Sequence, residues 1–270
     1  MTIFQAVVLG LVQGATEFIP VSSSGHLLLV PWLFGWEPPG LAFTIVVHLG
    51  TVFGVVLFFW KDWVAMIRAG IRWLRTGEVN AETKLLGLIL LGIIPAAVIG
   101  GLFRTFFESV FKQPIVAVLM LLVTALLLFL GERLGKLRRA VDDMTWRDSL
   151  FIGFAQALAI LPGISRSGST IAAARLRDLK RDDAARYSFL LSTPLIIGIG
   201  PIEITALIQD GSKIPDVGVL IVGFLVAFVS AYLIIRWLLK FLRMRSTNVF
   251  AWYCAAASLL GLVVFVMRAV

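Results

Sequence analysis

The chain has 270 residues, of which 59% are apolar, and its mean hydropathy is +0.96. A soluble domain contains roughly half apolar residues, so this composition excludes a soluble globular protein and indicates an integral membrane protein. The net charge is +8, but the basic residues stand in short clusters between apolar runs, a pattern that sets membrane topology. We therefore expect the lipid bilayer, and no nucleic acid, as a partner.

The first apolar stretch covers residues 1–35, and Pro20, three serines and Gly25 interrupt it. Two arms of ~15 helical residues would each rise about 22 Å, which is shorter than a hydrocarbon core of about 30 Å. This stretch therefore predicts a re-entrant hairpin, in which two short helices enter the membrane and return to the same side. Residues 147–175 repeat the pattern, with Pro162 and Gly163 at the break.

Six further apolar runs are long enough to cross a membrane as helices. We place these spans at 41–60, 83–103, 113–131, 186–207, 216–238 and 249–268. The predicted fold class is an all-α polytopic membrane protein with six transmembrane helices and two re-entrant helical hairpins.

Clusters of Lys and Arg predict the orientation of the chain. They follow the first, third and fifth spans and precede the fourth, whereas residues 1–40 contain no Lys or Arg. By the positive-inside rule the basic connections are cytoplasmic and both termini lie outside. Each half, about 1–143 and about 144–270, holds one hairpin and three spans. The second half is then inverted relative to the first, and the two breaks meet near the midplane. Because the halves share one site, we count 1–270 as a single membrane domain.

The break in the first hairpin carries the chemistry of the first half. Gln13 and Glu17 are four residues apart and share a helix face. A carboxylate within the membrane costs about 2.5–3.5 kcal/mol, so we expect Glu17 to be paired or functional. The turn Ser22–Gly25 offers hydroxyls and backbone N–H groups just before a helix start, a combination that binds phosphate. His26 follows directly and is suited to relaying a proton near neutral pH.

The second break repeats this turn and adds Arg166 between two serines. A planar guanidinium suits bidentate recognition of phosphate. The alternative role for Arg166 is that of a structural partner of Glu17, and this role also brings the two breaks into contact. His48, in the middle of the first span, is either a pocket wall or a hydrogen-bonded core histidine. The candidate phosphate ligands of the two breaks are Gln13, Ser22, Ser24, Gly25, Ser165, Ser167, Gly168 and Thr170.

Over essentially its whole length the chain resembles the bacitracin-resistance type of undecaprenyl-diphosphate phosphatase. The resemblance rests on Gln13-x-x-x-Glu17, Pro20-Val-Ser-Ser-x-Gly-His26, Asp142-Asp143-Met-Thr145 and Pro162-Gly-x-Ser-Arg-Ser-Gly-x-Thr170. Members of that family often carry Glu where this chain has Gln13, which argues against an obligatory base at this position. The resemblance implies functional roles for Glu17, Ser23, His26 and Arg166. It also implies cleavage of the lipid diphosphate to the monophosphate, which recycles the lipid carrier for peptidoglycan synthesis and gives bacitracin resistance.

On this hypothesis Ser23 is the nucleophile, and either His26 or Glu17 accepts its proton. Direct attack by water, with Ser23 only binding phosphate, stays open. A Mg²⁺ or Ca²⁺ ion bridging Glu17 and the diphosphate should arrive with the substrate, because the chain has too few acidic residues for an all-protein metal cage. We expect the site to open to the outer, periplasmic face of the cell membrane. A homodimer is compatible with the sequence.

The alternative function is a transporter or flippase for a lipid phosphate or small anion, because inverted repeats with broken helices are the architecture of alternating access. On that view Arg166 and Glu17 hold the substrate and a coupling ion. The Ser-x-x-His pattern next to Glu17 favours the enzyme, since transport does not require it.

Overall fold

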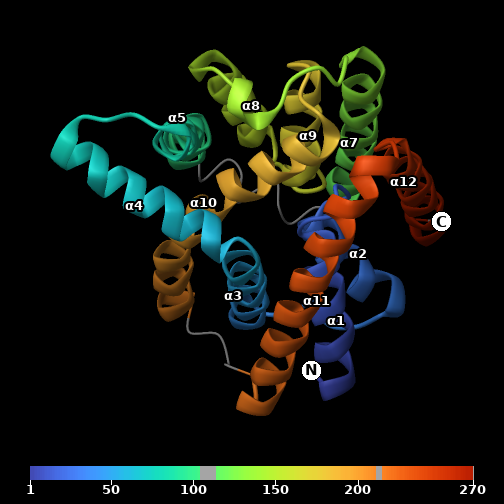
Figure 1. Ribbon diagram of the computed structural model, residues 1–270. Helices are drawn as coiled ribbons and strands as arrows, with labels where there is room; N and C mark the ends of the chain where they lie inside the picture. Colours follow the sequence, from blue (N-terminus) through green and yellow to red (C-terminus); the bar gives the residue numbers. More distant parts are fainter. Residues whose placement is uncertain (104–113, 211–214, 270) are drawn as a thin grey trace.

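The computed structural model describes residues 1–103, 114–210 and 215–269, and within these ranges the chain is helical with short connections (Figure 1). The helices of the first half are α1 (Ile3–Thr16), α2 (Ser23–Phe34), α3 (Leu41–Phe58), α4 (Trp60–Thr76), α5 (Ala81–Leu102) and α7 (Pro114–Leu134). A 3-10 turn at Val141–Asp143 precedes the second half, which holds α8 (Trp146–Leu158), α9 (Arg166–Leu176), α10 (Arg181–Asp210), α11 (Val217–Met244) and α12 (Asn248–Ala269).

All six predicted spans are confirmed as long apolar helices. In the described part of the chain, six helices are long and apolar enough to cross a membrane, namely α3, α5, α7, α10, α11 and α12. The chain is thus a multi-pass membrane protein. Helix α11 continues to Met244, beyond the predicted end at 238, because Lys and Arg are good helix formers whose heads reach water at the membrane boundary. The predicted start of the third span, residue 113, lies outside the described residues.

Both interrupted stretches form two short helices separated by a break, as the sequence predicts. In the first, α1 ends at Thr16 and α2 begins at Ser23; in the second, α8 ends at Leu158 and α9 begins at Arg166. Ser22 and Ser165 cap the second helix of each pair, because each hydroxyl accepts a hydrogen bond from the backbone N–H three residues later.

Each first arm packs closely against a span of the opposite half. Helix α1 lies beside α11, and α8 lies beside α5 (Figure 1). Two glycines show how close these contacts are. A Cβ added to Gly14 would lie 2.6 Å from the carbonyl oxygen of Ala227, and one added to Gly153 would lie 2.4 Å from that of Gly92. Small residues of this kind let membrane helices approach to backbone contact, so these two contacts fix where each break is held.

A buried carboxylate organises the start of the second half, outside the six spans. Asp148 is fully buried in the first turn of α8, and its oxygens accept hydrogen bonds from Arg139 and Arg177, each at 2.6 Å. The backbone N–H and hydroxyl of Thr145 donate to the same carboxylate. Burial opposes ionisation, but these hydrogen bonds outweigh it and hold the pKa of Asp148 below its usual range.

We expect Asp148→Asn to lower the free energy of unfolding by about 3–5 kcal/mol, because two arginines lose a buried partner. Since the pKa of Asp148 is lowered in the folded state, its contribution is fully present above the unfolded pKa of about 3.9 and is lost as pH falls below that value. Thermal unfolding in detergent between neutral and acidic pH provides the measurement. The parent should lose stability on acidification more steeply than Asp148→Asn, and parallel curves would contradict the assignment.

Candidate active site

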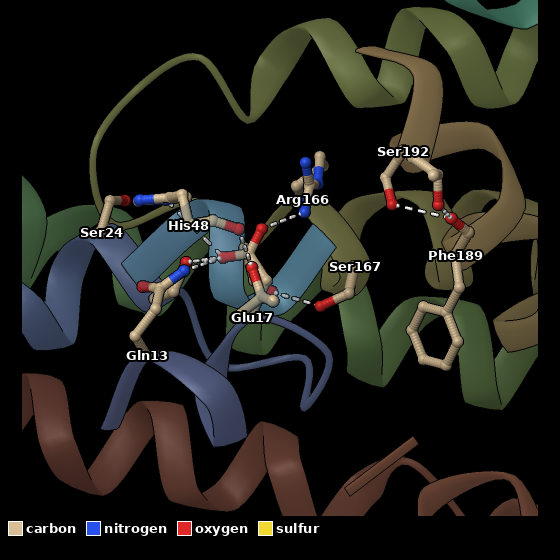
Figure 2. Close-up of polar contacts among 12 residues, drawn as sticks. Gln13, Glu17, Ser24, His48, Arg166, Ser167, Phe189 and Ser192 are labelled. Atoms are coloured by element: carbon tan, nitrogen blue, oxygen red, sulfur yellow. Dashed lines mark hydrogen bonds and ion pairs between the residues drawn. The ribbon is translucent and has the colours of Figure 1, made fainter. Parts of the chain in front are cut away.

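The carboxylate of Glu17 is the point at which the two breaks meet. It lies at the C-terminal end of α1, is buried, and accepts hydrogen bonds at Oε2 from Gln13 Nε2 at 2.9 Å and from Ser23 Oγ at 2.5 Å. Arg166, the first residue of α9, donates from Nη2 to Oε1 and forms an ion pair. Figure 2 shows Gln13 and Arg166 approaching Glu17 from different sides. The sequence suggests a role for Arg166 as the partner of Glu17, and the structure shows this pair.

His48 of α3 is a further neighbour of this carboxylate. Its Nε2 lies 3.9 Å from Glu17 Oε2. Its Nδ1 is 2.8 Å from the carbonyl oxygen of Thr44, and because a carbonyl only accepts, Nδ1 carries a proton. Its Nε2 therefore faces the Glu17 carboxylate, at a distance beyond that of a hydrogen bond. Of the two roles considered for His48, this geometry supports a place in the wall of the site.

Ser22 holds an unusual backbone conformation directly before Ser23. Its φ is +72°, whereas its counterpart Ser165 has a φ of −73°. A non-glycine residue in that region is strained by about 1–3 kcal/mol and persists only where the surroundings hold it. Here the carbonyl oxygen of Ser22 accepts from the backbone N–H and from Nδ1 of His26. The strained residue precedes the Ser23 hydroxyl, which donates to Glu17.

His26 is engaged elsewhere in the site. Its Nδ1 donates to the carbonyl of Ser22 at 2.7 Å, so its Nε2 accepts from the hydroxyl of Tyr253, also at 2.7 Å. The two rings stack with centroids 5.6 Å apart. The described contacts therefore place Glu17, and not His26, on the Ser23 hydroxyl. Sequence reasoning missed Tyr253, because it lies in an apolar span 227 residues from His26 and no local pattern singles it out.

We expect Tyr253→Phe to lower the free energy of unfolding by about 1 kcal/mol, the usual net worth of one hydrogen bond, and to leave turnover within about tenfold of the parent. The reason is that Tyr253 bonds to His26, while Ser23 bonds to Glu17. Tyr232→Phe, which removes a hydroxyl from another span, is the matched control. A loss of turnover as large as that expected for Ser23→Ala would show that the Tyr253 hydroxyl takes part in the chemistry.

The hydroxyls of the second break mainly form hydrogen bonds within the break and to the helices next to it. Ser165 Oγ caps α9 through the Gly168 N–H at 3.0 Å, while its own N–H donates to Thr124 of α7. Thr170 Oγ1 bonds to the Arg166 carbonyl and to Ser188. Ser167 Oγ donates to the carbonyl of Ile19 at 3.3 Å, which ties the second break to the first (Figure 2). In the first break, Ser24 lies 3.4 Å from Ser22 Oγ.

Two polar atoms at the site stay without a hydrogen-bond partner among the described residues. They are Nε of Arg166 and Oε1 of Gln13, and both are buried. The Nε–H of Arg166 is thus a donor, and Oε1 of Gln13 an acceptor, that no described residue uses. The helix starts of α2 and α9 lie at the same place, and such starts favour anions. The arrangement thus suits a group with several anionic oxygens.

The site does not by itself fit a resident metal ion. Both oxygens of Glu17 are occupied by donors, and the described residues contain no group of three or more His, Cys, Asp or Glu able to hold one. A cavity of about 210 Å³ lies away from the two breaks, between α4, α5 and α10. Its charged lining residues are two acidic and two basic side chains, Asp62, Glu82, Lys61 and Arg186.

Comparison with known proteins assigns this arrangement to a family. The model of the family described as bacitracin resistance protein BacA matches residues 6–260. The chain belongs to the BacA family. Three relatives, each called undecaprenyl-diphosphatase, come from Pelotomaculum thermopropionicum, Myxococcus xanthus and Desulforudis audaxviator. The first is 41% identical over 100% of this chain and 98% of its own length. The second is 43% identical over 97% of this chain and 89% of its own length. The third is 40% identical over 99% of this chain and 100% of its own length. Both breaks lie inside the part that matches the BacA family, which confirms the resemblance seen in the sequence.

Proposed function

We propose that this BacA-family chain hydrolyses undecaprenyl diphosphate to undecaprenyl monophosphate and inorganic phosphate within the membrane. The observation that carries the proposal is the convergence of Glu17, Ser23 and Arg166 from two breaks that are far apart in the sequence. Phosphoryl transfer uses a nucleophile, a base and a cation. Here the Ser23 hydroxyl is the nucleophile, the Glu17 carboxylate to which it is hydrogen-bonded is the base, and the Arg166 guanidinium is the cation.

Arg166 binds the diphosphate on this proposal. Its Nη2 pairs with Glu17 and its Nε is unpartnered among the described residues, so one edge of the guanidinium remains for phosphate oxygens. Gln13 holds Glu17 through its amide nitrogen. The charge that builds up on the transferred phosphoryl group is stabilised by Arg166 and by the N-terminal ends of α2 and α9.

Ser23 Oγ attacks the terminal phosphorus while Glu17 accepts its proton. The bond between phosphorus and the bridging oxygen breaks, and undecaprenyl monophosphate leaves with the bonding electrons. Glu17 passes the proton that it received to the leaving monophosphate and is a carboxylate again. Water then attacks the phosphoserine while Glu17 takes a proton from the water. The bond between phosphorus and the Ser23 oxygen breaks, Glu17 returns the proton to that oxygen, and inorganic phosphate leaves. The 2.5 Å contact between Ser23 Oγ and Glu17 Oε2 favours Glu17 as the base over His26.

The proposal includes the finer topology expected from the sequence. Each pair of short helices, α1 with α2 and α8 with α9, enters the membrane and returns to one side, and the two halves are inverted copies. The matching contacts of α1 with α11 and of α8 with α5 support this arrangement. We further propose that both termini face outside, that the site opens to the periplasm, and that Mg²⁺ or Ca²⁺ enters as a counterion of the diphosphate.

The test is phosphate release from a C55 polyprenyl diphosphate by the purified protein in detergent, with and without Mg²⁺ or Ca²⁺. We expect stoichiometric formation of the monophosphate, with lower activity after chelation of divalent cations. A folded protein that binds the lipid without releasing phosphate would overturn the proposal and favour the transporter. Phosphate release that is unchanged by chelation would show that the reaction needs no divalent cation, and that part of the proposal would be wrong.

A further inference from the structure

Helix α4 (Trp60–Thr76) is the longest helix of the described chain that is not a candidate span. It begins directly after α3 and ends five residues before α5, so it joins the ends of two neighbouring spans. Figure 1 shows it on the outside of the molecule, leading away from α3. Because it joins two candidate spans and is not one itself, α4 is placed where an interfacial helix would lie.

One face of α4 is fixed against the protein. Met66 and Ala69 are buried, and α4 packs against α5. Asp62, on the same face, forms an ion pair with Arg186 of α10. These contacts fix the rotation of the helix about its axis, and therefore the direction of its other faces.

Two stripes run along the remaining surface, offset by one residue. An exposed apolar stripe consists of Trp60, Ile67, Ile71 and Leu74. A basic stripe consists of Lys61, Arg68, Arg72 and Arg75, all exposed. Successive residues of a helix are about 100° apart around its axis. Each cation directly follows an apolar residue of the other stripe, so the two stripes run side by side, a little more than a quarter turn apart. Leu74 is 77% and Ile67 is 55% exposed in the protein alone.

Among the described residues, the basic stripe has no paired acidic counterpart. Across residues 1–103, 114–210 and 215–269, none of its four cations forms an ion pair with a carboxylate. Lys61 also lies over the ring of Trp60, 5.8 Å from its centroid. Four cations without an ion-pair partner among the described residues, along the edge of an apolar stripe, match the boundary between lipid headgroups and acyl chains. Anionic headgroups attract such cations, and neutral ones do so far less.

We propose that α4 is an interfacial helix that binds the headgroups of anionic phospholipids. Its apolar stripe enters the acyl region and its basic stripe holds phosphate groups, which adds a lipid-binding surface separate from the two breaks. The surface and the site are connected along the chain, because α4 directly follows α3, which carries His48 beside Glu17. This inference does not depend on the reaction proposed above.

The test measures phosphatidylglycerol retained by the full-length protein in native mass spectrometry after extraction from phosphatidylcholine bilayers containing a minor share of phosphatidylglycerol. We compare the parent with Arg68→Gln/Arg72→Gln/Arg75→Gln. Loss of three cations from an anionic surface should lower the affinity for phosphatidylglycerol at least about tenfold. The matched control, Lys136→Gln/Arg138→Gln/Arg147→Gln, removes the same charge from the connection between α7 and α8 and should retain the lipid.

A triple Arg→Lys variant at 68, 72 and 75 keeps the charge and should restore binding, which separates loss of charge from loss of folding. Equal retention by the parent and the Gln variant would overturn the proposal, as would equal losses in the Gln variant and in the control. Preferential retention of a polyprenyl monophosphate over phosphatidylglycerol by α4, abolished in the Gln variant, would also overturn it, because the surface would then serve the product.

Discussion

Ser23→Ala should lower phosphate release by at least about 10³-fold while leaving binding of the lipid diphosphate within about 1 kcal/mol of the parent. The large effect on turnover follows from loss of the attacking oxygen, and the small effect on binding follows from loss of a single hydrogen bond. Single-turnover release and titration with the lipid provide the two measurements. Ser246→Ala, in the connection between α11 and α12, is the matched control and should behave like the parent.

If Ser23→Ala retains turnover within about tenfold, the phosphoserine intermediate is wrong. Glu17 would then act on a water molecule in the place that the Ser23 hydroxyl now takes. Trapping of a labelled phosphoserine by acid quench in the parent, and its absence in Ser23→Ala, distinguishes the two routes independently of the rates.

Arg166→Ala should lower turnover by about 10³–10⁵-fold, the range found for arginines that stabilise transferred phosphoryl groups. It should also lower the free energy of unfolding by about 3–5 kcal/mol, because Glu17 is left buried without its partner. Arg166→Lys should recover part of the stability but little of the turnover, since an ammonium group lacks the planar fork. Arg147→Ala, at an exposed arginine, is the control for loss of charge.

The double variant Glu17→Gln/Arg166→Met separates the structural from the chemical effect. Replacing both members of a buried pair restores most of the stability that removal of one member costs, so this variant should unfold near the parent and still release no phosphate. Recovery of turnover in the double variant would show that Arg166 serves only to neutralise Glu17.

Residue patterns predicted the six spans and the two breaks because Pro, Ser and Gly interrupt apolar runs in a way that depends on local chemistry alone. They did not predict α4, because its basic residues indicate a connection between two spans. The contact of Glu17 with Arg166 also followed, since two isolated charges within a membrane favour each other. The sequence could not decide whether Glu17 or His26 is the partner of Ser23. That choice depends on the positive φ of Ser22 and on the position of Tyr253. Both are set by packing between distant segments.

The burial of Arg175 was unforeseen for the same reason. It is fully buried near the end of α9 and donates to the carbonyl oxygens of Leu179 and Gly135. In the sequence it stands among other basic residues of a connection, and only the approach of α7 to α9 encloses it. Patterns that assign charges to loops do not distinguish a cation that satisfies buried carbonyls from one that faces solvent.

The pairing of Glu17 with Arg166 also constrains the order of assembly during synthesis. The two residues are 149 positions apart, so the first hairpin leaves the ribosome long before its counter-charge exists. With the first break inside the membrane, as proposed above, an ionised Glu17 carries a penalty of about 2.5–3.5 kcal/mol until α9 arrives. We therefore expect the first hairpin to remain at the membrane edge or to bind a holding partner, and to settle only when the second half docks. A helix of the second half thus completes a site to which Ser23, among the first residues translated, also belongs.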